Sequence, residues 1–197
     1  MRIRITFAVL LLLMPPLAPR ANAADFCTEA WVIRNMIFDR LGHCFSSVAG
    51  RMLFDNSNCT MSGPTPPPAL AQDVARIRDG ETFVGCRIDT SQPPSAAMRQ
   101  THARFSRFID LPVPDHVGGY ACWGYRGPAF RLLAGASMSA PEVGIAQTGQ
   151  SVVTTYWGRP GGWTFGTIMT GPGGAVLTEG WFAGVDISEG NCDLVAG

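Results

Sequence analysis

The chain has 197 residues, of which 15 are Lys or Arg and 15 are Asp or Glu. This even balance lacks the excess positive charge with which proteins bind nucleic acid or anionic lipid, so we expect neither as a partner. Because 46% of the residues are hydrophobic and only 15% are charged, the composition predicts a folded chain and not a disordered one.

The N-terminus has the pattern of an export signal. Arg2 and Arg4 precede an almost unbroken apolar run over residues 5–14, and residues 21–23 (Ala-Asn-Ala) place small side chains where a signal peptidase cuts. The apolar run has about half of the roughly 20 residues that a transmembrane helix needs. We therefore predict a signal peptide over residues 1–23 and no membrane anchor after its cleavage.

Cys27 lies close behind the predicted cleavage site without forming a lipoprotein signal. Asp25 and Phe26 precede it, whereas a lipobox requires small residues there. We therefore expect a periplasmic or extracellular protein that carries no lipid.

All six cysteines follow the predicted signal peptide, and an even number in an exported chain indicates disulfides. Six cysteines allow about 15 complete pairings. The simplest scheme that keeps each bond within one half of the chain pairs Cys44 with Cys59, Cys27 with Cys86 and Cys122 with Cys192. A metal site is the other reading of clustered cysteines, but the chain has no CxxC pair and no neighbouring histidines, so we expect no metal.

The first part of the chain has helical patterns separated by polar loops. The first helix is expected to begin at Thr28, a favourable N-cap residue, and to end at Gly42. A second helix is expected from Leu70 to an interruption at Gly80, and a third over residues 96–109. We assign residues 24–90 to a helical domain and residues 91–117 to a helical linker.

Residues 118–197 are rich in glycine and predict a β domain. Strands are expected over residues 129–133, 152–157, 163–170, 175–177 and 180–187, with a long loop over 134–143. Five short strands in so few residues predict a small barrel. The predicted fold class is α+β, with a disulfide-bonded helical N-terminal lobe and a small β-barrel.

Residues 34–45 (RNMIFDRLGHCF) resemble the signature of the YARHG domain, a presumed extracellular module of bacterial exported proteins. Six positions match that signature, namely Arg34, Asn35, Ile37, Arg40, Gly42 and Phe45. Asp39 and Leu41 depart from it, and Leu41 stands where the family has His, so no acid–base role is carried over. The resemblance covers residues 27–90 and implies an exported protein without an established activity.

Residues 129–187 are similar to bacterial SH3-like domains. The similarity lies in a Gly-Gln-Ser-Val segment, a Gly-Gly-Trp segment and a late Gly-Trp-Phe segment, and its framework positions are Gly149, Val152, Gly162, Trp163, Gly180 and Trp181. Such domains often bind cell-wall peptides or proteins, so the resemblance implies one of these as a partner, although a fold alone does not fix its ligand.

Two groups of residues are candidates for ligand binding. Arg34 and Arg40 could bind an anion or a carboxylate, but ion pairs within the domain are the more common role of such arginines. Tyr125, Tyr156 and Trp157 belong to an aromatic-rich segment in which exposed rings could bind a peptide or a glycan, while buried rings would form the core.

No linear motif predicts catalysis. The three histidines, His43, His102 and His116, lie far apart, and residues 135–139 lack the last glycine of a serine nucleophile elbow. Cys44 beside His43 would need to be a free thiol to act as a nucleophile. We therefore expect no cofactor and a non-catalytic binding or structural module, whose partner is a peptidoglycan peptide or an envelope protein. The alternatives are an exported enzyme or inhibitor with a site between the lobes, and binding by the helical lobe alone.

Overall fold

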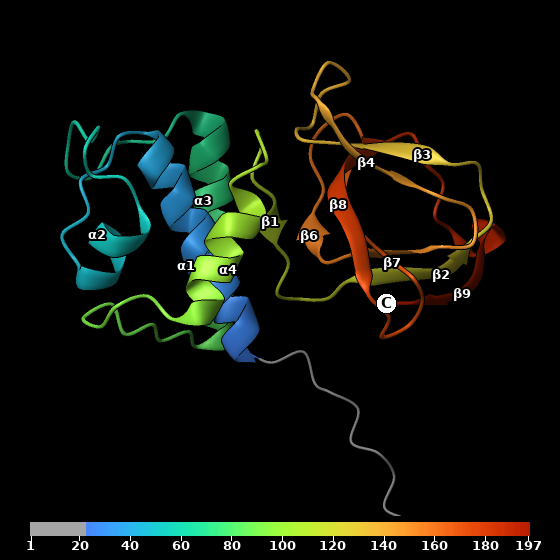
Figure 1. The fold of residues 1–197 in the computed structure, drawn as a ribbon, viewed down its shortest axis with the longest axis horizontal. Coiled ribbons are helices and arrows are strands. Elements are labelled where there is room, and N and C mark those ends of the chain that lie inside the picture. Colours follow the sequence, from blue (N-terminus) through green and yellow to red (C-terminus); the bar gives the residue numbers. More distant parts are fainter. Residues whose placement is uncertain (1–22) are drawn as a thin grey trace, which may run out of the picture.

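The computed structural model describes residues 23–197. The predicted signal peptide therefore lies almost entirely outside the described residues. Two parts lie side by side: a helical part (residues 23–112) and a sheet part (residues 113–197) (Figure 1). The helices are α1 (Ala23–Arg40), α2 (Val48–Leu53), α3 (Pro68–Val84) and α4 (Ala96–Phe105).

The three predicted helices are present with different ends, and α2 was not predicted. Helix α1 begins at Ala23, before the expected cap at Thr28, and Gly42 follows it in the left-handed conformation with φ 77°. Helix α3 continues through Gly80, where an interruption was predicted. Gly80 is needed there because a Cβ atom would lie 2.9 Å from Phe26 and 3.0 Å from His116.

Helix α4 is shorter than predicted and begins at a serine cap. The hydroxyl of Ser95 accepts a hydrogen bond from the backbone N–H of Met98 at 3.2 Å. We expect Ser95→Ala to lower the free energy of unfolding by about 1 kcal/mol and Ser95→Gly by only a few tenths, because glycine also suits this position. Urea unfolding of the two variants would measure this difference, and equal losses would contradict a capping role.

The sheet part contains a seven-stranded antiparallel sheet with the order β4-β3-β8-β7-β5-β2-β9. A separate two-stranded sheet pairs β1 with β6. The strands are β1 (Val113–Pro114), β2 (Tyr120–Tyr125), β3 (Phe130–Leu133), β4 (Glu142–Ala146), β5 (Ser151–Thr154), β6 (Tyr156–Trp157), β7 (Trp163–Met169), β8 (Val176–Ala183) and β9 (Cys192–Ala196).

The prediction of a closed barrel was wrong. The large sheet curls, but β4 and β9 are its two edges and do not pair with each other (Figure 1). Strands β1, β2, β4 and β9 were not expected, and β2 and β4 each contain a glycine, which weakens a strand pattern. Strand β9 instead extends the sheet at β2.

Side chains on the two faces of β7 and β8 enter two different cores. Phe165 and Trp181 lie opposite each other in the register and belong to a core that also contains the buried faces of α1, α3 and α4. Ile168 and Phe182 point to the other face and pack with Leu132 in a second core. The first core therefore joins the helical part to the sheet part, and residues 91–117, predicted as a linker, contribute to it through α4.

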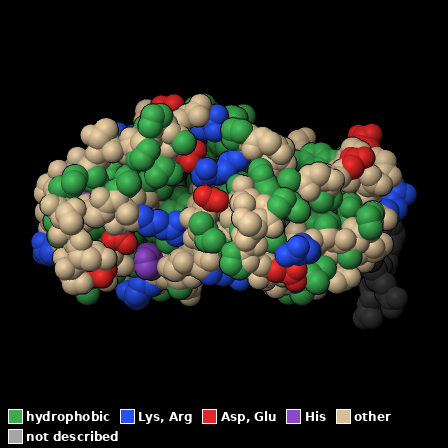
Figure 2. All heavy atoms as spheres, turned by 90° about the horizontal axis from the view of Figure 1, so that it is seen from above, with side chains coloured by type: hydrophobic (Ala, Val, Ile, Leu, Met, Phe, Trp, Pro, Cys, Tyr) green, Lys and Arg blue, Asp and Glu red, His purple; other side chains and the backbone are tan. Residues whose placement is uncertain are grey.

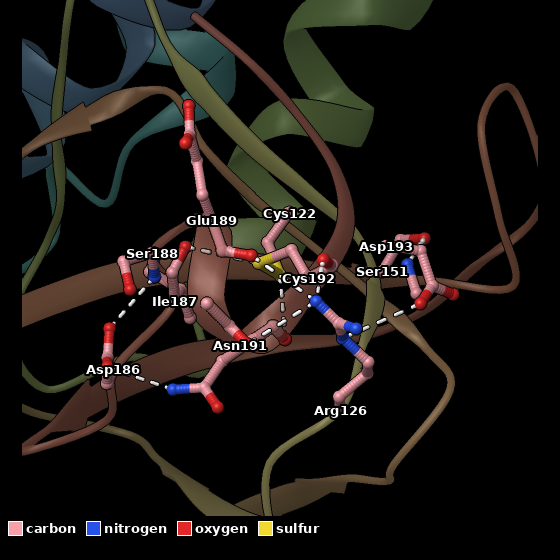
Figure 3. The surroundings of a disulfide bond; sticks show 12 residues. Cys122, Arg126, Ser151, Asp186, Ile187, Ser188, Glu189, Asn191, Cys192 and Asp193 are labelled. Carbon is pink, nitrogen blue, oxygen red and sulfur yellow. Dashed lines mark hydrogen bonds and ion pairs between the residues drawn. A yellow bond between two sulfur atoms is a disulfide. The ribbon is translucent and has the colours of Figure 1, made fainter.

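The three disulfides have the predicted pairing: Cys27–Cys86, Cys44–Cys59 and Cys122–Cys192. Figure 3 shows the last of these, which joins β2 to β9. Beside it, Arg126 donates a hydrogen bond of 2.6 Å to the carbonyl oxygen of Cys192. Three disulfides indicate an oxidising, extracytoplasmic compartment.

Candidate functional site

A hollow of about 500 Å³ opens on the helical part between α1 and the start of α3. The segment that resembles the YARHG signature forms one wall and the proline-rich connector before α3 forms another, so we call it the signature hollow. Its lining residues are Arg34, Asn35, Phe38, His43, Gly63, Pro64, Thr65, Pro66, Ala71, Val74, Ala75 and Arg78.

The loop structure after α1 fixes the position of His43 in this hollow. Its Nδ1 accepts a hydrogen bond from the backbone N–H of Gly63 at 2.9 Å, and its ring lies edge-on to Phe45 with 4.6 Å between centroids. The Cys44–Cys59 disulfide closes the same loop. Because Nδ1 accepts, a neutral His43 carries its proton on Nε2.

Of the two arginines that line the signature hollow, one is paired with an acid and the other is not. Arg34 makes a two-pronged ion pair with Glu81 of α3, with its Nε 3.0 Å from Oε2 and its Nη2 3.1 Å from Oε1. Arg78 is exposed and lies over the ring of Phe38 at 6.0 Å, and it forms no ion pair among residues 23–197. Arg78 is therefore the cation that remains available to a ligand.

No carboxylate is among the described residues that line the signature hollow. Glu81, which does not line the hollow, is paired with Arg34. The amide nitrogen of Asn35 donates to the carbonyl oxygen of Trp31 at 2.7 Å. An anionic ligand would thus meet the unpaired guanidinium of Arg78 and the ring of His43, with no carboxylate among the described lining residues to repel it.

The second predicted arginine, Arg40, does not reach the signature hollow. It donates hydrogen bonds of 2.7 Å to the carbonyl oxygens of Phe108 and Ile109, which follow α4. Burial lowers the pKa of Arg40, while the charges of Asp110 and Asp39 oppose this effect. Arg40 therefore holds the chain after α4 against α1.

The predicted aromatic residues do not form an exposed surface. Tyr125 is 3% exposed and Tyr156 is 7% exposed, so these two candidates are core residues. Trp157 is half-buried against the core, and the guanidinium of Arg76 lies 5.4 Å from the centre of its ring. Tyr156 and Trp157 alternate along the strand, yet both pack against the core that joins the two parts, Tyr156 fully and Trp157 in part.

The described residues contain no group of three or more His, Cys, Asp and Glu side chains placed to hold a metal ion. All six cysteines are in disulfides. Within residues 23–197, no helix is long and apolar enough to cross a membrane. His43, His102 and His116 remain separate, and His43 alone lies in the signature hollow.

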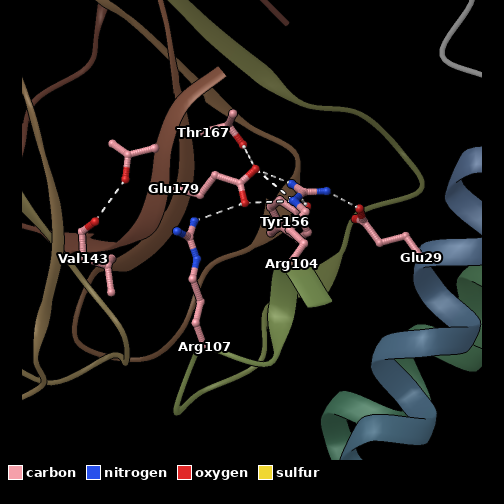
Figure 4. A network of polar contacts seen from close by, with 8 residues as sticks. Glu29, Arg104, Arg107, Val143, Tyr156, Thr167 and Glu179 are labelled. Atoms are coloured by element: carbon pink, nitrogen blue, oxygen red, sulfur yellow. Dashed lines mark hydrogen bonds and ion pairs between the residues drawn. The ribbon is translucent and has the colours of Figure 1, made fainter. Parts of the chain in front are cut away.

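The sequence analysis missed a charged network between the two parts (Figure 4). Arg104 of α4 lies at its centre, 2.6 Å from Oε1 of Glu179 and 2.7 Å from Oε2 of Glu29. Arg104 also donates to the hydroxyl of Tyr156 at 3.0 Å. Its two acid partners are each 75 residues away in the chain, so no local pattern could reveal them.

Burial changes the pKa values of side chains in this network. It raises the pKa of Glu29 and raises the pKa of Tyr156 well above its usual value. Burial alone would lower the pKa of Arg104, but the hydrogen bond to Glu179 and the surrounding negative charge raise it instead. Arg104 stays charged and neutralises the buried carboxylate of Glu179, which is 4% exposed.

A second ion pair crosses the same boundary, since Nη2 of Arg159 lies 2.8 Å from Oδ2 of Asp73 in α3. Figure 2 shows basic and acidic side chains next to each other near the middle of the face that it views, where the helical part meets the sheet part. The contact between the parts is thus made of a shared core with ion pairs around it.

Two family models match the chain. The model described as "Domain of unknown function (DUF4453)" matches residues 85–197, and the model of the YARHG domain matches residues 6–75. The YARHG resemblance of residues 34–45 is thereby confirmed, whereas neither family model is an SH3-like one. Neither the curated proteins nor the solved structures include a match.

Proposed function

The chain belongs to the family described as "Domain of unknown function (DUF4453)", and from this premise we propose that it is an exported, non-catalytic binding protein. In this proposal the signature hollow takes a carboxylate-bearing peptide of the cell wall in the periplasm or at the cell exterior. The observation that carries the proposal is the unpaired Arg78 in a hollow that also presents His43 and has no lining carboxylate among the described residues.

The chemistry of the hollow favours a peptide carboxylate. Guanidinium groups bind carboxylates through paired hydrogen bonds, and cell-wall peptides carry several free carboxylates. The apolar wall of prolines and alanines suits small side chains such as the alanines of those peptides. From the sequence we expected a binding site among the aromatic residues of the sheet part. The proposed site lies in the helical part instead.

The test measures the affinity of the oxidised protein for the wall tripeptide L-Ala-γ-D-Glu-meso-diaminopimelate by titration calorimetry. We expect Arg78→Gln to weaken binding about tenfold or more, because a hydrogen bond to a charged group contributes about 1.5–3 kcal/mol. Arg87→Gln is the matched control, since Arg87 is also exposed but lies outside the signature hollow.

Amidation of the tripeptide carboxylates is expected to remove binding. If the amidated peptide binds equally well, or if Arg78→Gln leaves the affinity unchanged, the proposed site is wrong. If the wall tripeptide does not bind but peptides from envelope proteins bind through their terminal carboxylate, the proposed site is supported and the proposed wall ligand is wrong.

A further inference from the structure

A second hollow, of about 510 Å³, lies where the start of α1, the end of α3 and the loop between β1 and β2 meet. It shares no lining residue with the signature hollow, and we call it the acidic hollow. Its lining residues are Asp25, Phe26, Glu29, Val84, Pro114, Asp115, His116, Val117, Gly118, Gly119 and Thr155.

Two exposed apolar side chains stand at the acidic hollow. Val117 lines it and is 74% exposed, and Phe83, at the end of α3, is 76% exposed. The ring of Phe83 lies 5.0 Å from that of His116, which places it beside the lining. A single exposed apolar residue needs no explanation, but two of them beside a hollow that also has apolar walls are typical of a contact surface.

Carboxylate side chains line the acidic hollow. Asp25, Glu29 and Asp115 contribute three carboxylates, and no Lys or Arg is among the described residues that line it. Arg104 pairs with Glu29, with 2.7 Å between Nη1 and Oε2, so the free negative charge of the hollow comes from Asp25 and Asp115. Oδ1 of Asp115 accepts a hydrogen bond from the backbone N–H of Val117 at 2.9 Å. Asp25 makes no ion pair with any residue of the described range. The hollow thus keeps a net negative charge next to apolar surface.

We propose that the acidic hollow is a docking surface for a peptide segment of another exported protein, in which a Lys or Arg stands between apolar residues. The cation would enter among the carboxylates while the apolar neighbours cover Phe83 and Val117. The negative charge disfavours anionic lipid as the occupant. Charge complementarity with apolar anchors on each side selects a basic, apolar segment over an acidic one.

The experiment titrates the exported, oxidised protein with the peptide Ac-Ala-Leu-Lys-Leu-Ala-NH2 and follows the backbone amide signals by NMR. We expect saturable shifts of Val117, Gly118 and Thr155, and none at Leu194, which is 63% exposed on β9. The same peptide with Glu in place of Lys is expected to bind at least fivefold more weakly.

Variants separate the apolar and the charged contributions. Phe83→Ser and Asp115→Asn are each expected to weaken binding at least fivefold, while Leu194→Ser leaves it unchanged. Equal affinity for the Lys and Glu peptides overturns the proposal, as do shifts that centre on Leu194. Absence of saturable shifts up to about 1 mM peptide, the weak end of the usual affinity range, also overturns it. Because the mapping uses the unmodified protein, it does not depend on the folding of any variant.

Discussion

Arg104→Met is expected to lower the free energy of unfolding by about 3 kcal/mol at neutral pH, measured by urea unfolding of the oxidised protein. The substitution keeps most of the apolar stem but leaves Glu179 buried in the sheet without its main cation. Removing one partner of a buried ion pair costs roughly 3–5 kcal/mol. We expect the lower end of this range because the side chain of Arg104 is 34% exposed and water screens part of its charge.

The pH dependence of the Arg104→Met variant identifies the cause. Burial raises the pKa of Glu29 and the charge of Arg104 opposes this effect, so the loss of Arg104 should raise the Glu29 pKa further above its unfolded value. The folded variant then holds this proton more tightly than the unfolded chain does. The loss of stability relative to the unmodified protein should therefore be largest above that raised pKa and become smaller as the pH falls to about 5. Adding Glu179→Gln should recover part of the loss at neutral pH, because it removes the unpaired charge.

Arg107→Met is the matched control for this prediction. Arg107 also faces Glu179, but at 3.7 Å and with 46% of its side chain exposed. Pairs of this kind contribute about 0–1 kcal/mol. If both variants lose the same stability, or if the loss in Arg104→Met does not depend on pH, the central role assigned to Arg104 is wrong.

The sequence predicted those parts of the structure that depend on local patterns. The disulfides match the simplest pairing that keeps each bond within one half of the chain. Gly42 ends the first helix because only a residue that tolerates a positive φ fits there. The strands at residues 130–133 and 163–169 followed from runs of apolar and aromatic residues. Turn and helix signals of this kind act over a few residues, so they can be read without a partner.

The parts that the sequence did not predict depend on distant partners. Tyr156 is buried because α4 covers its strand, and its hydroxyl accepts a hydrogen bond from Arg104, 52 residues before it. Arg34 was a candidate ligand-binding residue, but Glu81, 47 residues away, accepts hydrogen bonds from its Nε and Nη2. Arg78 lies in the site because α3 packs against α1, and nothing in its neighbourhood in the sequence distinguishes it from other exposed arginines.

Trp181→Ala is expected to have the largest effect on stability, lowering the free energy of unfolding by about 4 kcal/mol. Trp181 is fully buried at the contact between the two parts, with the ring of Phe165 at 5.4 Å and the guanidinium of Arg159 at 5.3 Å. Its indole N–H donates to the carbonyl oxygen of Asp110 at 2.8 Å. The substitution leaves a large cavity and an unpaired carbonyl, and Trp-to-Ala changes in cores cost about 3–5 kcal/mol.

Two further variants assign the loss at Trp181 to packing and to the hydrogen bond. Trp181→Phe keeps an aromatic ring but no N–H donor, so we expect a loss of about 1–3 kcal/mol, as for a buried carbonyl left without its partner. Trp163→Ala, at a half-buried position of β7, should cost less than Trp181→Ala because neighbouring solvent fills the space that the ring leaves. Urea unfolding with Trp fluorescence and far-ultraviolet circular dichroism would measure all three. If the two parts fold as one unit through this core, both signals change together in every variant, and a separate early transition of the sheet part would contradict a shared core.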